Sequence, residues 1–93
     1  MIKSFKCKET NKIWNGFFSK KLPSDIQKIA LRKLFMLESA FNIDDLKKPP
    51  NNKLELLKGD RQGQYSIRIN NQWRICFKWL DNSAFDVEII DYH

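Results

Sequence analysis

The sequence predicts an α+β domain in which two N-terminal helices pack on a small antiparallel sheet. Apolar residues recur at helical spacing in the first half of the chain, whereas the last third alternates apolar and polar residues. Turn-forming residues separate the alternating segments. Helices that precede strands in this way are typical of the α+β class. Because the chain has 93 residues, we expect a single domain over residues 1–93.

Two segments carry the helical spacing. We expect the first helix over residues 9–19, although Gly16 weakens it. One face of that helix would hold Ile13, Trp14, Phe17 and Phe18. The second helix should begin after Pro23, because Ser24 and Gln27 are spaced as in a capping box. Its buried face would hold Ile26, Ile29, Ala30, Leu34, Leu37 and Phe41.

The remaining elements are predicted to be a loop and a sheet. Residues 44–52 contain Pro49-Pro50 and should form the loop. Residues 54–57 are compatible with the start of a strand, and residues 2–5 with a short opening strand. A three-stranded meander should follow, with its odd-numbered face on the helices. That face would hold Tyr65, Ile67, Ile69, Trp73, Ile75, Phe77, Trp79, Phe85, Val87 and Ile89.

The charge of the chain suggests a polyanionic partner. Seventeen Lys and Arg against 11 Asp and Glu give a net charge of +6, for which nucleic acid is the leading partner and solubility the plain alternative. Residues 53–79 hold six cations and two anions, and residues 81–93 hold four acids and no cation. This segregation favours a basic patch over an evenly charged surface.

Several classes of protein do not fit the composition. Cys7 and Cys76 are the only cysteines, and their separation gives neither a disulfide framework nor a zinc-binding motif. The N-terminus lacks the apolar run of a secretory signal, and no segment reaches membrane-spanning length. We therefore expect a cytoplasmic protein that uses no metal or cofactor and has no membrane partner.

Cations on the even-numbered face of the sheet are candidate ligands for phosphate. Arg68, Arg74 and Lys78 alternate with the apolar residues and should project away from the helices. An arginine fork can bind two phosphate oxygens and stabilise charge that develops on phosphorus. The alternative is that polar residues on an outer face are only what strand alternation produces.

The chain ends in Asp91-Tyr92-His93, and His93 is its only histidine. Counting by twos from Phe85 places His93 on the apolar face of the last strand. We expect a β-bulge at Ile89-Ile90 to reverse the sides, because two adjacent isoleucines break the alternation there.

Several segments together resemble a known family, the HigB toxins of the RelE/ParE superfamily. The resemblance covers essentially the whole chain. Its segments are Met1-Ile2-Lys3-Ser4-Phe5-Lys6, Lys21-Leu22-Pro23, Leu57-Lys58-Gly59-Asp60-Arg61 with Gly63, Tyr65-Ser66-Ile67-Arg68-Ile69-Asn70, Gln72-Trp73-Arg74-Ile75-Cys76-Phe77 and Asp91-Tyr92-His93.

This resemblance implies a RelE-like fold and a toxin that cleaves mRNA in the decoding site of the 70S ribosome. It also implies a HigA-type helix-turn-helix antitoxin that represses the shared operon. The catalytic positions it implies are Lys58, Arg74, Asp91, Tyr92 and His93. The substrate-binding positions that we expect from the resemblance and the charge pattern are Arg68, Arg61 and Lys78.

Metal-free RNA cleavage is compatible with these residue types, since the 2′-hydroxyl of RNA can attack the adjacent phosphorus. In our hypothesis Arg74 and Arg68 hold the scissile phosphate, and Lys58 and His93 share proton transfer and charge neutralisation. Tyr92 stacks on a base or orients it, and Asp91 orients His93 or Arg74. Which group is base and which is acid stays open. Two alternatives stay open as well: a ParE-like toxin that inhibits DNA gyrase, and an RNA-binding protein without catalysis.

Overall fold

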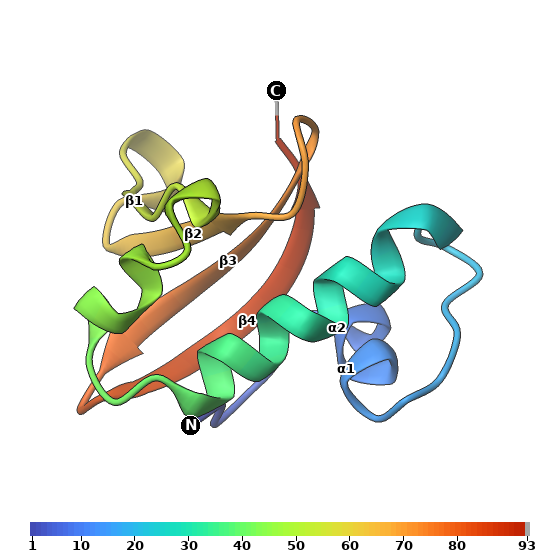
Figure 1. Ribbon diagram of the computed structural model, residues 1–93, viewed down its shortest axis with the longest axis horizontal. Coiled ribbons are helices and arrows are strands. Elements are labelled where there is room, and N and C mark those ends of the chain that lie inside the picture. The colour runs from blue at the N-terminus through green and yellow to red at the C-terminus, as the bar shows by residue number, and fades with distance from the viewer. Residues whose placement is uncertain (93) are drawn as a thin grey trace.

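A computed structural model describes residues 1–92 of the chain, so His93 lies outside the described residues. Two helices precede a four-stranded antiparallel sheet with the strand order β1-β2-β3-β4 (Figure 1). The elements are α1 (Lys8–Trp14), α2 (Ser24–Ser39), the 3₁₀ helices η1 (Ile43–Lys47), η2 (Pro50–Asn52) and η3 (Gly59–Arg61), and the strands β1 (Glu55–Leu56), β2 (Gln64–Arg68), β3 (Trp73–Leu80) and β4 (Ser83–Asp91). The predicted α+β architecture is confirmed.

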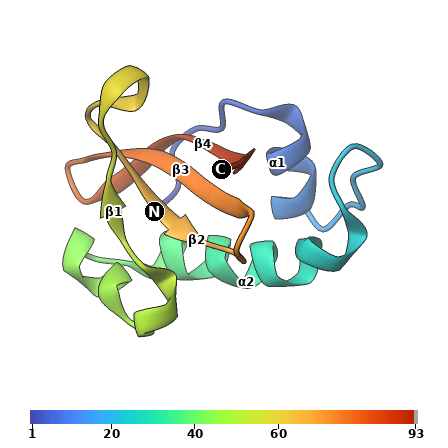
Figure 2. The same cartoon turned by 90° about the horizontal axis from the view of Figure 1, so that it is seen from above.

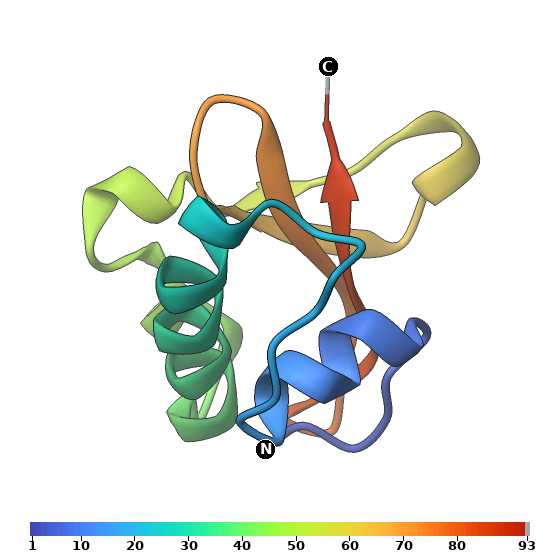
Figure 3. The same cartoon turned by 90° about the vertical axis from the view of Figure 1, so that its right-hand side faces the viewer.

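The first helix and the first strand lie far apart in the molecule. Helix α1 lies at one end and β1 at the other, with β3 and β4 between them (Figure 2). The N-terminus and the end of β4 lie at opposite ends of the molecule (Figure 3). None of the helices within residues 1–92 is long and apolar enough to cross a bilayer.

Helix α1 is shorter than the sequence predicted. It ends at Trp14, and Gly16 adopts φ +87°, a left-handed conformation that a glycine accepts readily at a helix end. The chain beyond it is not helical, and Phe17 and Phe18 are exposed. The predicted end at residue 19 is therefore wrong, because Gly16 stops the helix.

Helix α2 lies where it was predicted, but its N-terminus has no capping box. Pro23 is the N-cap residue and makes no side-chain cap. The side chain of Gln27 instead accepts from the Ser19 amide at 3.0 Å and donates to the carbonyl oxygens of Ser19 and Leu22 at 2.8 and 3.0 Å. Gln27 thus fixes the α1–α2 connection. Phe41 follows the end of the helix and is 78% exposed, so its predicted place in the core is wrong.

The predicted loop over residues 44–52 contains no α-helix or strand, but two 3₁₀ helices organise it. Asn42 and Asp45 form a capping box at the start of η1. At the end of η2, the Asn52 side chain is fully buried and donates to the carbonyl oxygens of Leu46 and Lys48 at 3.1 and 3.2 Å. These bonds hold η2 against η1.

The predicted alternation is confirmed in β2 and β3. Their register pairs Tyr65 with Phe77 and Ile67 with Ile75, all on the face that packs on the helices. The sheet has one strand more than the predicted meander, since β1 pairs with β2. Residues 2–5 do not form a full strand and make two isolated parallel bridges to β4.

A bulge in β4 lies earlier than we expected. Cys76 pairs with Glu88, but Lys78 pairs with Phe85, so β4 carries one extra residue between them. Asp86 has φ +53° there, and its amide donates to Ser4 Oγ at 2.9 Å. The bulge places Phe85 on the outer face with Lys78, so its predicted place on the helix-packed face is wrong.

No bulge forms at Ile89-Ile90, and that prediction is also wrong. Ile75 pairs with Ile89 and Arg74 pairs with Ile90 in regular register. The amide of Ile89 is instead fixed by Thr10 Oγ1 of α1 at 2.9 Å. Because the alternation stays regular here, Tyr92 follows Ile90 onto the face that carries Arg74.

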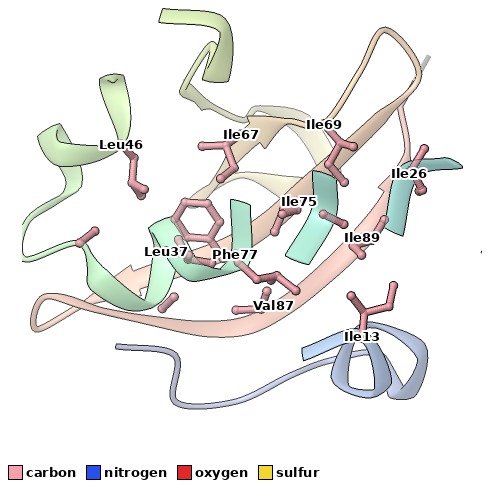
Figure 4. Packing of buried hydrophobic residues seen from close by; sticks show 14 residues of the cluster. Ile13, Ile26, Leu37, Leu46, Ile67, Ile69, Ile75, Phe77, Val87 and Ile89 are labelled. Carbon is pink, nitrogen blue, oxygen red and sulfur yellow. The ribbon is translucent and has the colours of Figure 1, made fainter. Parts of the chain in front are cut away.

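A single buried cluster joins the helices to the sheet. Ile13 of α1, Leu37 of α2 and Phe77 of β3 all point into it (Figure 4). The buried members are Ile13, Ile26, Ala30, Leu34, Leu37, Ala40, Leu46, Ile67, Ile69, Ile75, Phe77, Ala84, Val87 and Ile89. This cluster positions the outer face of β2, β3 and β4, where the polar side chains gather.

The Phe77→Ala variant should lose about 3–5 kcal/mol of unfolding free energy, because it removes a fully buried ring and leaves a cavity. Urea denaturation followed by circular dichroism measures the change. The matched control is Phe41→Ala, which removes an exposed ring and should change the free energy by less than about 0.5 kcal/mol. Equal losses in the two variants would contradict this core.

Candidate functional site

Arg74 is a cation held in place by neutral acceptors. Its side chain is 7% exposed on the outer face of β3. Nε donates to Ser66 Oγ at 2.7 Å, and Nη2 donates to the carbonyl oxygens of Lys53 and Ser66 at 2.6 and 3.4 Å. No carboxylate within residues 1–92 forms a salt bridge with it. Its charge is therefore not cancelled, although its position is fixed.

The backbone at Lys53 is adapted to this contact. Lys53 adopts a left-handed conformation with φ 44°, which costs free energy for a residue with a side chain. The hydrogen bond from Arg74 to the Lys53 carbonyl oxygen helps to stabilise that turn. The end of η2 and the middle of the sheet are thus joined through one guanidinium group.

Tyr92 covers Arg74. The ring centroid lies 5.3 Å from Arg74 Cζ, within the range of a cation–π contact. The Tyr92 hydroxyl donates to Glu55 Oε1 at 2.8 Å, and its amide donates to the Gln72 carbonyl oxygen at 2.6 Å. The hydrogen bond to Glu55 and the charge of that carboxylate raise the pKa of Tyr92. Tyr92 is therefore a neutral phenol at physiological pH, suited to stacking and to donating a hydrogen bond.

A cleft of about 660 Å³ opens beside Tyr92. This volume lies in the range of small-molecule pockets and is ample for a nucleotide. Lys58, exposed at the start of η3, is one of its cations. The cleft is lined by Glu55, Leu56, Leu57, Lys58, Asp60, Arg61 and Tyr92.

The charges in this cleft are more balanced than the sequence suggested. Arg61 forms an ion pair with Glu88 at 2.8 Å and donates to Gln64 Oε1 at 3.2 Å. Glu55 and Asp60 also line the cleft and oppose its two cations. Lys58 is therefore the lining cation that forms no salt bridge within residues 1–92, and Arg74 lies behind the ring of Tyr92 at the side of the cleft.

The structure brings together four of the predicted site residues: Lys58, Arg61, Arg74 and Tyr92. Arg68 is the Cα partner of Arg74, but its side chain donates to Asn71 Oδ1 and lines a second pocket against α2. Lys78 lies four residues along β3, about 13 Å away, and pairs with Asp86 at 3.3 Å. These two residues do not line the cleft.

Of the last two predicted residues, Asp91 is the final residue of β4. Asp91 is across from Trp73 and accepts from Gln72 Nε2 at 3.1 Å. The alternation of the strand puts it on the opposite side from Tyr92. His93 lies outside the described residues.

Sequence reasoning missed the partners that hold the site together. The contact between Ser66 and Arg74 could have been predicted, because a hairpin turn around residues 70–72 puts both side chains on the same face of the sheet. No sequence signal marks Glu55 as the acceptor for Tyr92, since the two are 37 residues apart. The Lys53 contact uses a carbonyl oxygen, which every residue has.

Residues 1–92 offer few groups for binding a metal or for catalysis by a thiol. Within residues 1–92, no three His, Cys, Asp or Glu side chains are grouped as metal ligands. Burial raises the pKa of the Cys76 thiol to about 11, so this cysteine is neutral and a poor nucleophile. The groups that can act on a ligand are the cations and Tyr92.

Comparison with protein families is decisive for the identity of the chain. The model of the RelE-like toxin of the type II toxin-antitoxin system HigB matches residues 3–93. The chain belongs to the HigB-like toxin family. It is thus the toxin of a toxin–antitoxin pair, as the resemblance implied.

Curated relatives agree with this assignment. Endoribonuclease HigB of Proteus vulgaris is 35% identical over 94 residues, covering all of both chains. Toxin HigB-1 of Vibrio cholerae is 42% identical over 65 residues, which are 70% of this chain and 68% of that protein. An uncharacterized Haemophilus influenzae protein is 45% identical over 64 residues, 69% of this chain and 63% of its own length, just under two thirds.

Solved structures support the fold of this HigB-like toxin. Two YoeB–YefM toxin–antitoxin complexes from Staphylococcus aureus contain a chain that superposes with a TM-score of 0.61. The identity is 19%, and the match covers 100% of this chain and 98% of the other. The predicted RelE-like fold is confirmed.

The Glu55→Gln variant should lower the pKa of Tyr92 toward its ordinary value, because it removes the charged acceptor that holds the phenol proton. NMR titration of ¹³Cζ-labelled tyrosine, in a Tyr65→Phe background, measures this pKa. Asp44→Asn is the control, since Asp44 is exposed and pairs with Lys47 instead. An unchanged Tyr92 pKa in Glu55→Gln would show that this contact does not form.

Proposed function

We propose that this HigB-like toxin is an endoribonuclease that cuts mRNA in the decoding site of the 70S ribosome. The observation that carries the proposal is the immobilised, uncancelled charge of Arg74 beneath the ring of Tyr92, beside a cleft that exposes Lys58. The relative from Proteus vulgaris, aligned along the whole chain, bears the name endoribonuclease.

In the proposed reaction the 2′-hydroxyl of one nucleotide attacks the adjacent phosphorus, and the bond to the 5′-oxygen of the next nucleotide breaks. The guanidinium of Arg74 stabilises the charge that grows on the non-bridging oxygens. Because Ser66 and Lys53 already fix that group, little reorganisation is needed when the charge develops. This is a role for a positioned cation and requires no metal.

The remaining site residues have other roles in this proposal. Tyr92 stacks on a base, and its neutral phenol is not a general base. Lys58, which is exposed, and His93 share proton transfer: one takes the proton of the attacking 2′-hydroxyl and the other gives a proton to the 5′-oxygen. Asp91 orients the C-terminal residue through the end of β4, where it also binds Gln72.

The three remaining cations are proposed to bind substrate outside the reacting phosphate. Arg61 and Lys78 already pair with Glu88 and Asp86, so their contribution depends on breaking those ion pairs. Arg68 has no carboxylate partner among residues 1–92 and is the stronger candidate.

The cellular setting follows from the same proposal. The partner that neutralises the toxin is a HigA-type helix-turn-helix antitoxin, in keeping with the family of the chain. A ribosome-dependent nuclease acts in the cytoplasm, where its substrate is translated.

Cleavage on translating ribosomes tests the proposal. Wild-type protein added to ribosomes that translate a defined mRNA should produce new 5′ ends inside decoding-site codons, mapped by primer extension. Lys58→Ala should slow cleavage by about 10²–10⁴-fold, since it removes a group in proton transfer or charge neutralisation. Lys47→Ala is the control, because Lys47 is exposed and pairs with Asp44 away from the cleft.

Two results would contradict the proposal in different ways. Intact transcripts together with inhibited DNA gyrase would favour the ParE-like alternative. Ribosome binding without cuts would favour an RNA-binding protein. Arg74 variants should be compared only after circular dichroism confirms folding, since Arg74 also joins the sheet to η2.

A further inference from the structure

A second pocket, of about 230 Å³, lies between α2, η2 and the end of β2. Three of its lining residues are cations and none is an acid. The lining residues are Ile29, Arg32, Lys33, Met36, Pro49, Asn51, Arg68 and Ile69. We call Arg32, Lys33 and Arg68 the cationic triad.

Lys33 is the most constrained member of the triad. Its side chain is 5% exposed, and Nζ donates to Asn51 Oδ1 at 3.3 Å and to Asn52 Oδ1. Both partners are neutral amides. Burial lowers the pKa of Lys33, and the neighbouring charges of Arg32 and Arg68 lower it further. A buried cation without a carboxylate partner lowers the stability of a fold, so an anion bound beside Lys33 would be stabilising.

The other two cations of the triad, Arg32 and Arg68, also have no carboxylate partner within residues 1–92. Arg32 is exposed on α2, and Arg68 donates to the neutral side chain of Asn71. Within residues 1–92, no salt bridge joins any member of the triad to a carboxylate. Arg68 also faces a fourth cation, Arg74, as its direct cross-strand partner, and such like-charge pairs are destabilising. One anion in the pocket would relieve these repulsions.

The pocket is connected to Arg74 of the candidate active site through η2 and β2. Asn52 accepts from Lys33, and the next residue, Lys53, accepts from Arg74 through its carbonyl oxygen. Arg74 in turn lies beneath the ring of Tyr92. Arg68 of the pocket is also the direct cross-strand partner of Arg74, so the two cationic groups lie side by side on β2 and β3.

We propose that the cationic triad binds a phosphodiester group of the RNA strand, next to the nucleotide that Tyr92 and Arg74 hold. This inference rests on the proposed function. The pocket is smaller than typical sites for whole small molecules, which suits a phosphate group more than a nucleotide. Arginine forks match phosphate oxygens, and an apolar floor that includes Ile29 and Ile69 strengthens the attraction.

An RNA strand fits this surface better than an acidic peptide. The neighbouring Tyr92 offers an aromatic face for a base, and stacking is a property of nucleotides. The triad thus holds the strand in register, while Arg74 meets the scissile phosphate. In this assignment the triad consists of positioning residues.

The test is an NMR titration of the full chain with a 2′-O-methyl RNA trinucleotide, which cannot be cleaved. The Nε–H signals of Arg32 and Arg68 and the ring signals of Tyr92 should shift together. A trinucleotide with neutral methylphosphonate linkages should shift the Tyr92 signals only. Inorganic phosphate should shift the arginine signals only, at higher concentration than the trinucleotide.

Arg32→Gln is the test variant, because Arg32 is exposed and its loss spares the core. It should raise the dissociation constant for the trinucleotide about 5–10-fold and reduce the slope of log K against log salt by about 0.7, as expected for one lost phosphate contact on a single strand. Lys20→Gln, an exposed cation outside the pocket, should change affinity less than about twofold.

Three results would overturn the inference. The first is that the trinucleotide shifts the signals of Tyr92 but not those of the arginines. The second is that inorganic phosphate binds more tightly than the trinucleotide. The third is that hexaglutamate shifts the arginine signals at a lower concentration than RNA does. The ribosome assay measures cleavage independently of this binding. Arginine shifts with the trinucleotide and no cleavage on ribosomes would support this pocket while overturning the nuclease.

Discussion

The hydrogen bonds from Arg74 to Ser66 and to the Lys53 carbonyl oxygen are the constraint on which the site depends. They join β3 to β2 and to the end of η2, and they hold a cation under the ring of Tyr92. Neutral acceptors position the guanidinium without cancelling its charge. A carboxylate in their place would hold Arg74 as firmly but would compete with a phosphate for it.

The placement of Tyr92 depends on a feature far from the site. The bulge at Asp86 shifts the alternation of β4 once, and the regular register beyond it then puts Ile90 and Tyr92 on the face of Arg74. Ser4 satisfies the Asp86 amide, and Thr10 satisfies that of Ile89. The N-terminal segment and α1 thus support the strand that brings Tyr92 to the cleft.

The same principle of neutral support recurs at the second pocket, where Asn51 and Asn52 hold Lys33. The acids of the outer face mostly serve other partners. Glu88 pairs with Arg61 and Asp86 with Lys78, whereas Glu55 fixes the phenol of Tyr92. Within residues 1–92, Lys58, Arg74 and the cationic triad form no salt bridge with a carboxylate, and unpaired cations of this kind suit a strand with regularly spaced phosphates.

The order of helices before strands and the inward faces of β2 and β3 could be predicted from the residues alone, because their periodicity shows which side of an element is buried. Its motifs also identified the family. The burial of Arg74, the distance of Lys78 from the cleft, and the contacts of Glu55 and Lys33 could not be predicted in this way. Those properties arise from contacts between segments distant in the chain, and from a bulge whose position a local alternation pattern does not fix.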